Sequence, residues 1–178
     1  MNKPKAWILA ILLAGAPLLA PSARAADKIG QLLYLFEIRD LSASAVQNLI
    51  VAPGLQQSAD PQQRCFANAI TVDALVVEMR VKFTAIFSDP TVADATIAFM
   101  ESPAGSKFSN FKMHGDADYT LPDLSRVLTP AEQQEVAAFG NSRAGSAFSS
   151  TIEGLEPMLL DSMNLVAGRA ACGSAAAH

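Results

Sequence analysis

The feature that most constrains the fold of this chain is an internal repeat with an offset of about 40 residues. Residues 99–108 recur as residues 139–148, with Phe, Ser, Ala, Gly, Ser and Phe at the same offsets. The match extends upstream to Pro90 and Pro130. A repeat of this kind describes an architecture, so the sequence indicates how the chain folds more directly than what it does.

Each copy predicts two short helices joined by a sharp corner. A side chain that can cap a helix precedes each predicted helix start, at Asp89, Ser102, Thr129 and Ser142. Prolines occupy the first helical position after three of these caps, where no hydrogen-bond donor is lost, at Pro90, Pro103 and Pro130. Glu132 falls three residues after Thr129 and completes a capping box. The repeat units therefore extend over about residues 89–111 and 129–150.

Gly105 and Gly145 fall in the first turn of the second helix of each unit. Without a side chain there, one helix backbone can approach the other closely, and the flanking phenylalanines can fill the space beside the contact. A loop in which glycine supplies an unusual backbone angle is the alternative. Neither interpretation makes these glycines catalytic. The predicted structural motif comprises Phe99, Ser102, Pro103, Gly105, Phe108, Phe139, Ser142, Gly145 and Phe148.

The motif resembles a bacterial envelope family described only as domain of unknown function 2059. The first copy matches at Phe99, Ser102, Pro103, Gly105 and Lys107, and Met100 departs from the usual tyrosine. The second copy matches at Phe139, Ser142 and Gly145 and departs at Gly140, Arg143 and Ala147. The resemblance covers about residues 89–150. It implies a small, mostly helical periplasmic protein, and it brings no catalytic residues.

The amino terminus predicts a signal peptide over residues 1–25. Lys3 and Lys5 precede an apolar run over residues 7–20, and Ala-Arg-Ala at residues 23–25 is a typical cleavage site. The apolar run is too short and interrupted for a membrane span, although an uncleaved anchor is the alternative. We therefore expect a periplasmic protein that begins near residue 26 and has no transmembrane segment after cleavage.

Charge and length limit the classes of partner and of fold. All 17 acidic residues follow the predicted cleavage site, but only 10 of the 13 basic ones do, so the net charge of the mature chain is near −7. No basic run is present, which argues against nucleic acids and anionic membrane surfaces as partners. The length predicts a single helical domain over residues 26–172, followed by a loose tail over residues 173–178.

The two cysteines, Cys65 and Cys172, predict a disulfide in an oxidising periplasm. It would close a loop of about 107 residues, for which chain entropy gives at most about 4–5 kcal/mol of stabilisation. Two buried free thiols are the alternative. The chain has no Cys-x-x-Cys spacing, so a redox-active pair is not expected.

Helical apolar spacing also predicts the elements outside the repeat. The expected helices cover residues 29–36, 44–51, 61–87 and 152–167. A break is expected at residues 40–44, residues 71–73 are a possible interruption, and Pro157 either kinks the last helix or marks a restart. The predicted fold is therefore all-α, a single compact bundle of six to eight helices.

One segment between the repeats clusters side chains of the types that bind metal ions, and it is the only such cluster in the sequence. It contains His114, Asp116 and Asp118. A calcium loop needs further oxygen ligands, and a zinc site needs three or four good ligands. We interpret the segment as a solvated turn in which the aspartates bond their own backbone. No metal or other cofactor is predicted.

Two further patterns could suggest catalysis, but each is better explained by a structural role. Residues 140–145 resemble a nucleophile elbow, but the segment is one residue too long and follows a predicted helix. Glu132 and Glu135 lie in a first helical turn, where negative charge suits the helix dipole. We therefore predict no catalytic residues and a protein that is not an enzyme.

The function that these observations favour is non-catalytic binding or interaction with a protein partner in the cell envelope. One alternative is a carrier of a small apolar ligand in an interhelical pocket, to which six Met and nine Phe could contribute, although the same residues suit an ordinary core. The other alternative is an envelope hydrolase, which would depend on the loop that holds His114.

Overall fold

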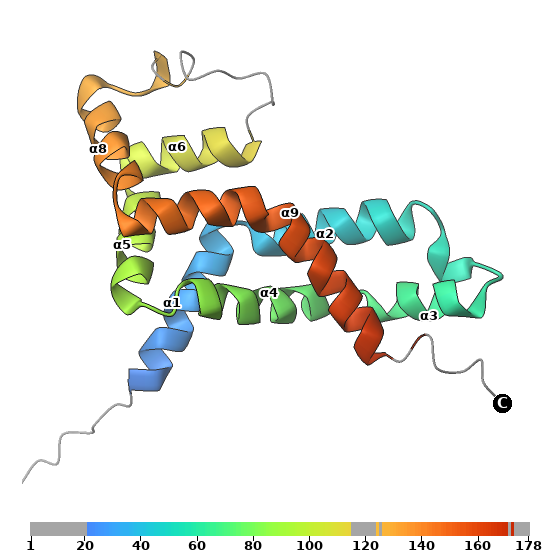
Figure 1. The fold of residues 1–178 in the computed structure, drawn as a ribbon. Helices are drawn as coiled ribbons and strands as arrows, with labels where there is room; N and C mark the ends of the chain where they lie inside the picture. Colours follow the sequence, from blue (N-terminus) through green and yellow to red (C-terminus); the bar gives the residue numbers. More distant parts are fainter. Residues whose placement is uncertain (1–20, 115–123, 125, 171, 173–178) are drawn as a thin grey trace, which may run out of the picture.

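The computed structural model describes residues 21–114, 124, 126–170 and 172, and it shows an all-α bundle (Figure 1). Its α-helices are α1 (Pro21–Leu35), α2 (Ile38–Val46), α3 (Pro61–Ala69), α4 (Val72–Ile86), α5 (Pro90–Glu101), α6 (Pro103–His114), α8 (Pro130–Gly140) and α9 (Arg143–Arg169). A π-helical turn (η1, Gln47–Val51) and a 3₁₀ turn (η2, Leu55–Gln57) follow α2. The described residues contain no strand, and the predicted fold class is confirmed.

The predicted helix starts in both repeat units are confirmed by their cap hydrogen bonds. The side chains of Asp89 and Thr129 accept from the backbone N–H groups of Thr91 and Glu132, and the capping box at Thr129 is complete. Ser102 Oγ accepts from Gly105 N at 3.1 Å, and Ser142 Oγ accepts from Gly145 N at 3.0 Å. These bonds span two or three residues, so the local sequence is sufficient to specify them.

The two repeat units pack against each other in a reciprocal way. The first helix of each unit contacts the second helix of the other, because α5 packs on α9 and α6 packs on α8. Equivalent rings therefore meet: Phe99 and Phe139 stack with centroids 3.7 Å apart, and Phe108 lies 5.9 Å from Phe148. The two copies thus form one structural unit through reciprocal contacts.

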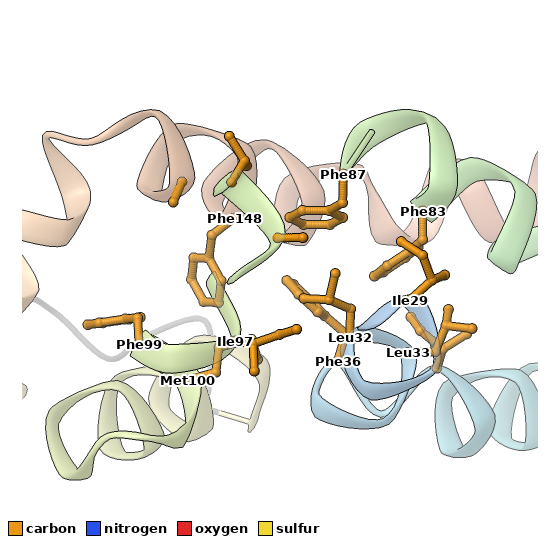
Figure 2. Packing of buried hydrophobic residues seen from close by; sticks show 14 of the residues in the cluster. Ile29, Leu32, Leu33, Phe36, Phe83, Phe87, Ile97, Phe99, Met100 and Phe148 are labelled. Atoms are coloured by element: carbon orange, nitrogen blue, oxygen red, sulfur yellow. The ribbon is translucent and has the colours of Figure 1, made fainter. Parts of the chain in front are cut away.

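The main core joins this unit to α1 and α4 (Figure 2). The apolar stripe predicted for the first helix is buried, with Phe36 against Phe83 of α4 and Phe148 of α9. Figure 2 shows Phe99, Ile97 and Met100 of α5 near the same rings. Large aromatic side chains at this junction bury much apolar area, which is the main favourable contribution to folding.

Two predicted boundaries near the amino terminus differ from the structure. The break expected at residues 40–44 is wrong, because the corner between α1 and α2 lies at Glu37 and Asp40 is in the first turn of α2. Glu37 has left-handed backbone angles, with φ of 52° and ψ of 34°, which non-glycine residues seldom adopt. The long apolar segment after Pro61 is two helices, and Thr71 caps the second of them.

The helix predicted over residues 152–167 is the second half of a longer helix, α9, which begins in the second repeat unit. Pro157 lies inside α9 near its middle, and Figure 1 shows the helix changing direction part-way along its length. A proline removes one backbone hydrogen bond and bends a helix, so Pro157 acts as a kink and not as a restart.

The carboxyl-terminal half of α9 is held by a second core, an ion pair and a disulfide. The second core comprises Ile50, Ala67, Ile70, Leu75, Leu159 and Met163. Arg169 donates two hydrogen bonds to Glu78, whose residue surface is only 4% exposed. The predicted Cys65–Cys172 disulfide is present, and it ties α3 to the chain beyond α9 with a Cα–Cα distance of 5.5 Å.

Several predictions about the amino terminus and the loop between the repeats fall on residues that the structure does not describe. Most of the predicted signal peptide, the metal candidates Asp116 and Asp118, and the predicted tail at residues 173–178 lie outside the described residues. Within the described part of the chain, none of the helices combines the length and the apolar character required to span a membrane.

Candidate functional site

The two glycines that follow the corners of the repeat units are buried. A Cβ atom built on Gly105 would lie 1.7 Å from the carbonyl oxygen of Phe99, and one on Gly145 would lie 2.0 Å from that of Phe139. These distances leave no space for any side chain. The glycines therefore permit the close approach of backbones that the sequence indicated.

The polar residues of the repeat motif connect the two units. Ser102 Oγ donates to Glu135 Oε1 at 2.5 Å, and Lys107 Nζ lies 2.8 and 3.0 Å from the two carboxylate oxygens of Glu132. The Lys107 ammonium and the Thr129 backbone N–H hold the pKa of Glu132 below its ordinary value. Sequence reasoning placed both glutamates in a first helical turn, but it did not find these partners in the other unit.

Replacing Lys107 by methionine is expected to lower stability in a pH-dependent way. Because the folded-state pKa of Glu132 is lowered, the contribution of the Lys107–Glu132 pair is fully present above the ordinary glutamate pKa of about 4.3. It is lost as the pH falls through the folded-state value. Urea unfolding of wild type and Lys107→Met should give a difference in unfolding free energy that is constant between about pH 5 and 7 and shrinks below about pH 4. A difference that stays constant down to about pH 3 would contradict this assignment.

Ser142 and His114 are among the residues that the sequence suggested for catalysis or metal binding, and the structure describes both. It does not describe Asp116 or Asp118. Ser142 Oγ donates to the Phe139 carbonyl and accepts from Gly145 N, so it caps α9 as interpreted from the sequence. His114 is the last residue of α6. Among the described residues, no three His, Cys, Asp or Glu side chains lie close enough together to hold a metal ion.

The best candidate for a functional site is a pair of adjoining clefts at the α1–α2 corner. One cleft, of about 380 Å³, lies between this corner and α6, and the other, of about 340 Å³, lies between the corner, α6 and α9. Both are lined by Glu37, Asp40 and Met113, so the two clefts adjoin at these residues. We call the pair the corner groove. Its other lining residues include Leu33, Tyr34, Leu35, Phe36, Arg39, Leu41, Met100, Ser106, Ser109, Asn110, Lys112, Ile152 and Leu155.

The corner groove combines apolar walls with polar groups suited to binding. Glu37 and Asp40 bring two carboxylates to it, while Leu33 and Met113 supply apolar surface. Tyr34 lines the groove, and its side chain is 81% exposed. Tyrosine is one of the residues that most often contribute binding energy in protein–protein interfaces. Ser109 also lines the groove, and its Oγ is buried without a hydrogen-bond partner. Because this oxygen is itself shielded from solvent, a ligand in the groove would not reach it, and the groove offers its polar contacts through other side chains.

The corner groove could not be found from the sequence because no local pattern marks it. The sharp turn is made by Glu37 in a left-handed conformation, where a glycine or asparagine would have been the usual signal. Left-handed backbone at a non-glycine residue is strained by about 1–3 kcal/mol, and such strain is concentrated at functional sites. The remaining walls come from helices far apart in the chain, so only their packing creates the depression.

In comparisons with known proteins, no protein-family model, no curated protein and no solved structure matches the chain. The similarity of the repeat motif to domain of unknown function 2059 therefore stays a prediction.

Proposed function

We propose that this protein is a non-catalytic periplasmic binding protein that holds a segment of a protein partner in the corner groove. The observation that carries the proposal is the groove itself, with a strained corner at Glu37 and the exposed side chain of Tyr34. The periplasmic location is supported by the predicted signal peptide and by the disulfide, a bond that persists in oxidising compartments.

The chemistry of the corner groove favours a partner segment with one apolar and one basic side chain. Leu33, Met100 and Met113 offer an apolar surface for the first. Asp40 brings negative charge to the groove for the second. Arg39 and Lys112 also line the groove, and Arg39 is paired with Asp73. The net charge of the full sequence, −4, attracts a basic partner at longer range. The exposed Asn110 amide can bond the backbone of an extended segment.

A non-catalytic role is supported by how the repeat uses its reactive side chains. Ser102 and Ser142 cap helices, and Glu132 and Glu135 contact the first repeat unit. A general acid, base or nucleophile must be free to reach a substrate, whereas these groups already have defined partners.

Photo-crosslinking at the rim of the corner groove tests the proposal. A benzophenone amino acid placed at Tyr34 should give one dominant protein adduct in cells that export the protein, and the adduct should fractionate with the periplasm. The matched control is the same group at Val81, which is 62% exposed on α4 outside the groove. Asp40→Lys should reduce the Tyr34 adduct several-fold, and Glu156→Lys on the exposed surface of α9 should not. Equal adducts from both positions, or none from a folded protein, would overturn the proposal.

A further inference from the structure

The outward side of α4 carries a row of apolar side chains. Ala74, Val77 and Val81 follow one another at spacings of three and four residues, so they lie on one side of the helix. Val77 is 59% exposed and Val81 is 62% exposed. We call these three residues the valine face. Exposed apolar side chains that adjoin one another in this way indicate a surface that contacts another protein.

A hollow of about 390 Å³ adjoins one end of the valine face, where the end of α9 packs on α4 (Figure 1). It is lined by Asp73, Ala74, Val77, Glu78, Val166 and Arg169. Val81 lies outside the hollow, one helical turn beyond Val77 and about 6 Å further along α4. One surface therefore holds a projecting apolar side chain next to a hollow that can receive one. The hollow shares no lining residue with the corner groove.

Two ion pairs join α4 to α9 beside the valine face, and each exposes mainly one of its partners. At the hollow, the Arg169 side chain is 66% exposed and that of its partner Glu78 is 5% exposed. Beside Val81, the Asp161 side chain is 60% exposed and that of its partner Lys82 is 21% exposed. The surface therefore presents a cation next to the hollow and an anion next to the projecting valine.

A two-fold rotation about the middle of this surface brings its unlike parts together. If two α4 helices pack antiparallel about Val77, Ala74 of each copy faces Val81 of the other, so each Val81 enters the hollow of the other copy. Asp161 and Arg169 are eight residues apart on one side of α9. The same rotation brings the anion of each copy toward the cation of the other.

We infer that the valine face and the adjoining hollow bind a second copy of this chain in a two-fold symmetric dimer. An interface of this kind requires one surface to be complementary to itself, and here both the shape and the exposed charges match after the rotation. The contact involves only part of α4 and α9, so the dimer is reversible. This inference is independent of the corner groove and of its protein partner.

Sedimentation equilibrium of the purified protein tests the association. The average mass should rise from that of one chain toward twice that value as the concentration increases to about 100 μM, a range in which micromolar complexes form. Val81→Lys places a charge against the hollow and should weaken the dimer about ten-fold or more. The matched control is Val127→Lys, at a valine that is 55% exposed before α8. A monomer at every concentration, or a dimer that both variants form as well as wild type, would overturn the inference.

The two exposed charges are tested with a matched pair of aspartates. Asp161→Asn should weaken the dimer several-fold and reduce its sensitivity to salt, because it removes the anion that faces Arg169. Asp94→Asn on α5 is the control, since Asp94 also pairs with a lysine and is 58% exposed, close to the 60% of Asp161. Equal effects of the two substitutions would contradict the proposed arrangement.

Cysteine cross-linking tests the symmetry. A residue on the two-fold axis meets its own copy, so Val77→Cys should form a disulfide-linked dimer under mild oxidation. Ala74→Cys and Val81→Cys should cross-link faster when mixed than either does alone. Val127→Cys is the exposed control. If Val77→Cys forms linked dimers no faster than Val127→Cys, the valine face does not meet itself and the inference is wrong.

The identity of the photo-crosslinked species separates this inference from the corner groove proposal. A benzophenone group at Val81 should capture a second copy of the chain, whereas the same group at Tyr34 should capture the partner protein. Val81→Lys should leave the Tyr34 adduct unchanged. A Val81 adduct that contains any other protein in place of a second copy would overturn the dimer, and loss of the Tyr34 adduct alone would count only against the corner groove.

Discussion

Gly105→Ala is expected to destabilise the protein by about 3 kcal/mol or more, at the upper end of what overpacking does. The added methyl carbon would lie 1.7 Å from the carbonyl oxygen and 2.5 Å from the carbonyl carbon of Phe99. Both are backbone atoms, so a side-chain rotation cannot relieve the overlap. The corner between α5 and α6 would have to open, and opening it would separate the stacked rings of Phe99 and Phe139. Urea unfolding followed by circular dichroism measures the effect.

Gly140→Ala is the matched control for this substitution. Gly140 is the last residue of α8, and a Cβ atom built on it has no neighbouring atom within 4 Å. Alanine is a better helix former than glycine, so stability should be unchanged or rise by about 0.5–1 kcal/mol. If Gly105→Ala is as stable as Gly140→Ala, the two helices of the first repeat unit do not approach each other as closely as the structure shows.

Replacing Cys65 and Cys172 together by alanine should lower the free energy of unfolding by up to about 4–5 kcal/mol. The disulfide closes a loop with a sequence separation of 107 residues, so it removes much of the conformational freedom of the unfolded chain. In the folded state it fixes the end of α9 to α3, next to the second core at Ile70 and Met163. The measurement is the urea midpoint of the variant compared with that of the oxidised wild type.

A reductant provides the control for the disulfide. Dithiothreitol should move the wild-type midpoint toward that of the double variant, while the double variant itself should not respond. If wild type is equally stable with and without reductant, the bond contributes nothing to folding. Hydrogen exchange would then show whether the α3–α9 contacts alone hold the carboxyl-terminal end of the protein.

The position of α1 connects the corner groove with the predicted export signal. Leu33 and Tyr34 of α1 line the corner groove. The predicted cleavage site at residues 23–25 lies in the first turns of α1, which begins at Pro21. The α1 residues that line the groove follow the cleavage site. Removal of the predicted signal peptide would therefore shorten α1 and leave the corner groove intact.

The sequence by itself determined the helical class, the helix starts in the repeat and the cysteine pair. Caps such as Thr129 with Glu132 depend on bonds over three residues, and glycine or proline at fixed positions restricts the backbone directly. The disulfide followed from the presence of only two cysteines in a chain with a predicted export signal. These features are readable because each depends on neighbours in the chain or on the number of residues of one type.

Only the tertiary structure decided how the repeat units meet and where the clefts lie. The partners Lys107 and Glu132 are 25 residues apart, and no local rule pairs them. The left-handed turn at Glu37 has no glycine to indicate it, so it forms because packing of Phe36 and Ile38 on both sides outweighs the local strain. A cleft is the space left between helices, and its shape depends on crossing and contact of segments that the sequence specifies only through the whole core.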